Sequence, residues 1–164
     1  MFALDRVLRA CRLGLIVAAL GLVSLAHAQG APSGLSDADK QQIKKYTLSE
    51  DVFNRLVAAT KDARAQGITP KGAPDPSKVH NLDDLAAQAM AGDERIPALV
   101  KKYGFTPREF MLANIALTNA ILAVQARNDP ATANNLNPVW VNPDNIRFID
   151  AHQAEIAALM QGGP

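Results

Sequence analysis

The sequence predicts an all-α fold, a small mostly antiparallel helical bundle around one long apolar helix at about residues 107–127. In several segments apolar residues recur every three or four positions, as on one face of a helix, and helix-capping sequences precede most of these segments. No segment has the apolar-polar alternation of a strand over a useful length. The 164 residues, 48% of them hydrophobic, suit one domain with a single core.

The first 28 residues have the composition of a secretory signal peptide. Three arginines lie within residues 1–12, residues 13–25 carry no charge, and residues 26–28 read Ala-His-Ala, with small residues where a signal peptidase cleaves. An uncleaved anchor is the alternative, but this apolar stretch is short for a bilayer-spanning helix. We expect cleavage after Ala28 and a periplasmic or secreted mature protein with no membrane span.

Loss of this leader changes the charge and removes Cys11. Three of 17 basic and one of 16 acidic residues leave with the 28 residues, so the mature chain has 136 residues, 14 basic and 15 acidic. A nearly neutral chain lacks the basic surface that nucleic acid requires, so we expect no nucleic-acid partner. Without cysteine it forms no disulfide, thiolate metal site or covalent haem, and we expect no cofactor.

The mature chain divides into a disordered lead-in at 29–35, a single helical domain at 36–161 and a tail at 162–164. Ser36 is a good N-cap for a short helix that ends near Tyr46. Thr47-Leu48-Ser49-Glu50 matches a capping box with the threonine at the N-cap, and it predicts a longer helix to about Gln66.

The middle of the chain predicts a loop and two short helices. Residues 68–79 contain three prolines and a glycine without helical or strand periodicity, which is typical of a loop. Asn81 then caps a short helix that closes at Gly92, and a second short helix carries Pro97 in its first turn and stops at Gly104.

Thr106-Pro107-Arg108-Glu109 is the clearest helix start, with a hydroxyl N-cap, proline at N1 and glutamate at N3. Phe105 and Phe110 are spaced to form a hydrophobic staple, and no charged residue follows until Arg127. Large apolar residues point almost all round the predicted helix, so we expect it to be covered on most sides. They are Phe110, Met111, Leu112, Ile115, Leu117, Ile121, Leu122 and Val124.

The last part of the domain predicts a long surface connection and a final helix. Residues 128–142 are rich in Asn, Ala and Pro, and Asn142-Pro143 repeats the combination of N-cap and proline. Val141 is placed to staple onto Ile146, and one helix is expected to run to about Gln161.

A candidate ligand site involves Asn114, Thr118 and Trp140. Asn114, Thr118 and Gln125 interrupt the apolar helix on nearly one side, where they either line a small pocket, face solvent or form a buried hydrogen-bonded set. The structural alternatives are favoured, because an apolar helix in a small bundle needs an outward side. Trp140, the sole tryptophan, either covers the core as a lid, the favoured alternative, or contacts a partner.

A candidate metal site involves His152 and Glu155, which share a helix face at i and i+3. His80 is the only other histidine of the mature chain. Two ligands without an HExxH or similar pattern make a weak metal site, so a capping or surface histidine is the favoured alternative.

The segments GFTPREF at 104–110 and VNPDNIRFI at 141–149, behind a signal peptide, resemble a group of small exported bacterial all-helical proteins of uncharacterised function. The resemblance covers most of the mature chain. It implies an exported helical fold. Because both motifs are helix starts, it assigns no role to any residue.

Three functional hypotheses follow from the sequence. The first is a non-catalytic domain of the bacterial envelope that binds a protein partner or forms a homodimer, since a long apolar helix is present and no catalytic pattern is found. The second is a periplasmic small-ligand-binding protein with an apolar pocket beside Asn114 and Thr118. The third is an enzyme or metal-dependent protein that uses His152 and Glu155.

Overall fold

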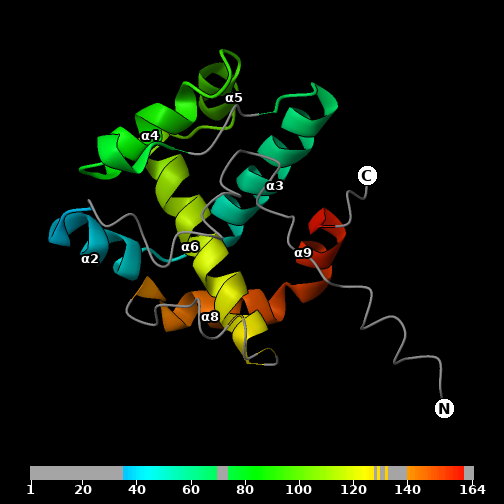
Figure 1. Cartoon of the computed structure of the whole chain (residues 1–164). Coiled ribbons are helices and arrows are strands. Elements are labelled where there is room, and N and C mark those ends of the chain that lie inside the picture. The colour runs from blue at the N-terminus through cyan, green and yellow to red at the C-terminus, as the bar shows by residue number, and fades with distance from the viewer. Residues whose placement is uncertain (1–34, 70–73, 128, 130–131, 133–139, 161–164) are drawn as a thin grey trace.

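The computed structural model describes residues 35–69, 74–127, 129, 132 and 140–160. Within these ranges the regular elements are all helices, which confirms the all-α prediction (Figure 1). They are α2 (Asp37–Lys45), α3 (Glu50–Ala65), the 3₁₀ helix η3 (Pro76–Lys78), α4 (Leu82–Met90), α5 (Ile96–Lys102), α6 (Pro107–Ala126), α8 (Pro143–Ala151) and α9 (Gln153–Met160). The predicted signal peptide, residues 29–34 of the lead-in and the tail lie outside the described residues.

The long helix α6 is the centre of the bundle. It packs against α2, α3, α4, α5 and α8, and Figure 1 shows α8 lying across its C-terminal end. Two separate clusters of buried apolar side chains lie against α6. A helix with cores on two sides needs apolar residues over most of its circumference, which explains why α6 lacks a single apolar stripe.

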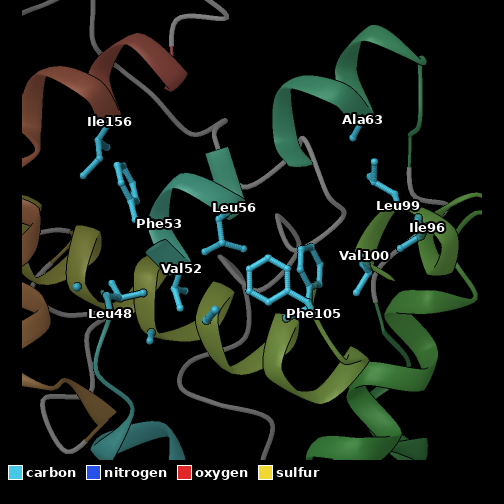
Figure 2. Close-up of a cluster of buried hydrophobic side chains, with 14 of the residues drawn as sticks. Leu48, Val52, Phe53, Leu56, Ala63, Ile96, Leu99, Val100, Phe105 and Ile156 are labelled. Carbon is cyan, nitrogen blue, oxygen red and sulfur yellow. The ribbon is translucent and has the colours of Figure 1, made fainter. Parts of the chain in front are cut away.

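The larger core cluster joins α3, α5, α6, α8 and α9. Figure 2 shows Phe53 and Ile156 toward one end of it and Ala63 and Leu99 toward the other. Three alanines of α6 belong to this cluster, and small side chains let neighbouring helices approach closely. Its members are Leu48, Val52, Phe53, Leu56, Ala63, Ile68, Met90, Ile96, Leu99, Val100, Phe105, Phe110, Ala113, Ala116, Ala120, Ile149 and Ile156.

The smaller core cluster joins α2 and α4 to the other side of α6. Met111 and Ile115, one turn apart on α6, contribute to it, and the half-buried Trp140 packs against it. Leu35, the last residue of the expected lead-in, is also buried in this cluster. Its members are Leu35, Ile43, Val79, Leu82, Leu85, Ala86, Met111 and Ile115.

The predicted N-caps at Ser36, Asn81, Thr106 and Asn142 are confirmed, because each side-chain oxygen accepts a hydrogen bond from a backbone N–H in the first turn of its helix. The Phe105–Phe110 staple is also present, with ring centroids 5.7 Å apart.

The capping box at residues 47–50 does not form as predicted. Ser49, rather than Thr47, is the N-cap of α3, and its hydroxyl accepts from the N–H of Val52 at 3.3 Å. The reason lies outside the local sequence. The N–H of Leu48 donates to the side-chain oxygen of Asn145 at 2.8 Å, which holds the connection extended beyond Thr47.

The single final helix is also a wrong prediction, because α8 ends at Ala151 and α9 begins at Gln153. His152 lies between them, with φ −111° and ψ 19° in place of helical values. Its ring Nδ1 is 2.7 Å from the carbonyl oxygen of Phe148, which also accepts from the backbone N–H of His152 at 3.2 Å, so side chain and backbone share this acceptor where α8 ends.

Helix α6 is less covered than predicted. Of its eight large apolar residues, Phe110, Met111 and Ile115 are buried and the other five are half-buried. Among the described helices, α6 alone has the length and the apolar composition to cross a membrane. Of its most apolar 18-residue stretch, 33% is buried. The core helix of a soluble protein passes the same test. Met111 and Ala113 are 0% exposed, so the first half of α6 lies in a protein core.

Candidate functional site

Asn114 and Thr118 lie one turn apart on α6, and Trp140 lies two residues before Asn142, the N-cap of α8. The side-chain amide of Asn114 donates to the carbonyl oxygen of Phe110 at 2.7 Å, within α6 itself. Thr118 is half-buried on the same helix. The carbonyl oxygen of Trp140 instead meets the side-chain amide of Asn119 at 3.4 Å. Trp140 thus reaches α6 through a residue outside the predicted trio, and its packing against the smaller core cluster supports the lid alternative.

Two open hollows lie away from these residues. One, of about 450 Å³, lies between α3 and α5 and is lined by Gln66, Glu94, Arg95, Ala98, Leu99 and Lys102. The other, of about 570 Å³, is lined by residues 91–95. The basic groups here are engaged, since Arg95 binds Asp93 and the carbonyl of Gln66, and Lys102 binds Asp62. Lys102 is the main reason why the pKa of Asp62 is lowered to about 2.

His152 is bound by a partner that its local sequence does not indicate. Its Nε2 lies 2.7 Å from a carboxylate oxygen of Glu50, the first residue of α3, and its ring stacks on Phe148 with centroids 4.0 Å apart. The hydrogen bond to the Phe148 carbonyl raises the pKa of His152 above its ordinary value, and Glu50 and Glu155 raise it further against the opposing effect of burial. The histidine therefore joins the start of α3 to the junction of α8 and α9.

Glu155 is exposed on α9 and acts on His152 only through its charge. Among the residues that the structure describes, no group of three or more His, Cys, Asp or Glu side chains is placed to hold a metal ion. The two-residue metal site stays a prediction, and both ring nitrogens of His152 already face oxygen atoms of the protein.

A buried ion pair links α2, α4 and α6. Asp39 is 4% exposed, and Arg108 of α6 donates to its carboxylate at 2.6 Å. The same carboxylate accepts from the Ser36 hydroxyl at 2.7 Å and from the N–H of Leu82, the first residue of α4, at 3.3 Å. Arg108 also contacts Asp83 at 2.7 Å. Burial acts to raise the pKa of Asp39, but the hydrogen bonds outweigh it, so the pKa is lowered.

Asn145 forms a second buried polar link, between α8 and the connection from α2 to α3. It is 1% exposed, its side-chain oxygen accepts from the N–H of Leu48 at 2.8 Å, and its amide donates to the carbonyl of Tyr46 at 2.8 Å. Asn142 donates to the same carbonyl at 3.1 Å. The two asparagines of the VNPDN segment therefore hold helices together.

We expect Asn145→Ala to lower the free energy of unfolding by about 2–3 kcal/mol, because it leaves the buried N–H of Leu48 without its acceptor and weakens the satisfaction of the Tyr46 carbonyl. Urea denaturation followed by circular dichroism measures the loss. Asn54→Ala, an exposed asparagine on α3, is the matched control and should change stability by no more than about 0.5 kcal/mol. Equal effects of the two substitutions would contradict the role of Asn145.

The C-terminal half of α6 presents one side whose residues are not among the buried members of either core cluster. At 100° per residue, Leu117, Thr118, Ile121, Leu122 and Gln125 fall on a single side of the helix, called here the outer α6 face. Gln125 is exposed and the other four are half-buried. Leu117 and Ile121 border the larger core cluster, whereas Leu122 belongs to neither cluster. This face combines three large apolar side chains with two polar ones, a composition that suits contact with another protein surface.

Comparisons with family models, with curated proteins and with solved structures find no match to this chain.

Proposed function

We propose that this chain is an exported, non-catalytic helical domain of the bacterial envelope that acts as a protein-interaction or self-association module through the outer α6 face. The observation that carries the proposal is the limited burial of α6. Only 33% of its most apolar 18-residue stretch is buried. Large half-exposed apolar side chains on one helix face are typical of surfaces that bind other proteins.

The polar side chains support the same function. Asp39, Arg108, Asn145 and His152 are buried or half-buried polar residues, and each is bonded between helices. These contacts fix the positions of the helices that pack around α6. The export part of the proposal rests on the leader-like composition of residues 1–28.

Native mass spectrometry of the chain purified from a periplasmic extract tests the proposal. The expected mass corresponds to residues 29–164, as a homodimer or in complex with a partner protein. Leu122→Glu should weaken the association about tenfold or more, since it places an unpaired charge in an apolar contact. Leu122 suits this test because it packs in neither core cluster, so the bundle should still fold.

Asn54→Glu is the control for added charge, since Asn54 is exposed on α3, away from the outer α6 face. It should leave the association unchanged. Crosslinking in intact cells distinguishes a homodimer from a complex with another protein. A bare monomer that gives no Leu122-dependent crosslink would contradict the interaction function, and a mass that retains residues 1–28 would contradict export with cleavage.

A further inference from the structure

The ionisable side chain of His152 lies at the junction between α8 and α9. The ring of His152 is stacked on Phe148, with ring planes 15° apart, and lies 5.4 Å from the ring of the fully buried Phe53, centroid to centroid. The imidazole is 14% exposed, and each of its two nitrogens has a defined partner. These partners determine which protonation state of the imidazole can form both hydrogen bonds.

The two partners together require a proton on both ring nitrogens. The Phe148 carbonyl, 2.7 Å from Nδ1, only accepts hydrogen bonds, so Nδ1 carries a proton. Glu50 presents a carboxylate oxygen 2.7 Å from Nε2, and a carboxylate only accepts hydrogen bonds. Both nitrogens donate only in the imidazolium form.

Loss of one proton places the Nε2 lone pair against the carboxylate. The ring has little room to turn, because Phe148 and Phe53 pack against it and Nδ1 is held by the Phe148 carbonyl. Glu50 is 67% exposed, so its carboxylate can leave into solvent. The contact that is lost on deprotonation is therefore the one between Glu50 at the start of α3 and His152 at the α8–α9 junction.

We infer that His152 and Glu50 form a pH-sensitive latch that fastens α9 to the start of α3 when His152 is protonated and releases it at higher pH. Among the described residues, α9 has two further side-chain hydrogen bonds to other helices, from Arg64 to the Leu159 carbonyl at 2.7 Å and from Gln153 to Asp150 at 3.4 Å. Ile156 stays in the larger core cluster. The released state is a loosened α9 on an otherwise folded bundle.

The surrounding charges set the direction of the effect. Glu50 on α3 and Glu155 on α9 both favour the charged ring. Asp51 of α3 and Asp150 of α8 are bonded to Arg55 and Arg127, at 2.9 Å and 2.8 Å. Because the pKa of folded His152 is raised, its contribution is complete below about pH 6.5 and is lost as the pH rises through the raised value.

Hydrogen exchange measured by mass spectrometry on the mature chain at about pH 5.5 and about pH 8.5 tests the latch on both sides of the histidine range. After correction for the intrinsic pH dependence of exchange, protection of residues 153–160 should fall several-fold at the higher pH. NMR titration of the imidazole protons should place the pKa of His152 above its ordinary value. The signals of His80 are identified with His80→Gln.

Glu50→Gln is the decisive variant. A glutamine amide can donate to the neutral ring, so the contact should survive at high pH and protection of α9 should become nearly independent of pH. The His152 pKa should also fall relative to the unaltered protein. His80→Gln, which changes an exposed histidine, should keep the full pH effect. Equal protection of α9 at the two pH values, or a pH effect that persists in Glu50→Gln, would overturn the inference.

Discussion

Phe53→Ala should lower the free energy of unfolding by about 3–5 kcal/mol, the range observed when a fully buried phenylalanine is truncated. Phe53 has 0% exposure and lies in the larger core cluster. Its ring packs edge-on to Phe148, with centroids 5.5 Å apart, and tilted to His152. The truncation therefore leaves a cavity between α3 and the α8–α9 pair, and urea denaturation followed by circular dichroism measures the loss.

Met111→Ala is the informative companion, because Met111 is equally buried but lies in the smaller core cluster. It should cost about 2–5 kcal/mol. Since α6 belongs to both clusters, we expect each variant to unfold in one transition with an unchanged dependence on urea. Val57→Ala, on the half-buried rim of α3, should have a clearly smaller effect. A loss below about 1 kcal/mol for Phe53→Ala would contradict its central position in the core.

Helix starts were predictable because their signals are local. The Thr106 hydroxyl accepts from the N–H of Glu109, three residues away, at 3.1 Å, and Asn81 caps α4 in the same way. Such bonds join residues that any helix brings together, so residue type and spacing suffice to find them. The same reasoning located α6, with its proline at N1 and its phenylalanine staple.

The N-cap of α3 was misplaced because a distant residue competes with the local pattern. The hydrogen bond from Leu48 to Asn145 spans 97 positions of sequence, and it delays the start of α3 from the predicted cap to Ser49. His152 was singled out for its chemistry, yet helical spacing suggested Glu155 as its companion, whereas its bonded carboxylate is that of Glu50. Helical spacing describes neighbours on one helix and contains no information about contacts between helices.

The buried ion pair was invisible to sequence reasoning for a related reason. Asp39 and Arg108 are 69 positions apart, and each is explained locally as part of the first turn of a helix. Burial of Asp39 depends on how α2 packs against α4 and α6. The sequence did contain one indication of the pair. Arg108 and Glu109 are the last two charged residues before the uncharged stretch of the apolar helix.

Arg108→Met should lower the free energy of unfolding by about 3 kcal/mol, the lower end of the range for removal of one partner from a buried ion pair. The side chain of Asp39 is 6% exposed and loses its counter-charge, although the Ser36 hydroxyl and the Leu82 N–H remain as donors. Lys40→Met, in the exposed pair of Lys40 with Asp37 on the same helix, is the matched control and should cost no more than about 0.5 kcal/mol.

The pH dependence separates loss of charge compensation from loss of packing. In the unaltered protein the pKa of Asp39 is lowered, so its contribution is present above the ordinary carboxyl pKa of about 4 and disappears as the pH falls through the lower folded value. In Arg108→Met, burial is less opposed and the pKa of Asp39 should rise toward or above its unfolded value, so that the loss of stability in acid from this group should shrink or change sign.

Asp39→Asn in the Arg108→Met background removes the unpaired charge and should recover part of the stability at pH 7. The same change in the unaltered protein should destabilise it, because Arg108 then keeps only Asp83 as a charged partner. Opposite effects of Asp39→Asn on stability in the two backgrounds are expected only if Arg108 compensates the charge of Asp39. If Asp39→Asn destabilises both backgrounds equally, Arg108 contributes through its packing alone, and the link between α2, α4 and α6 is not electrostatic.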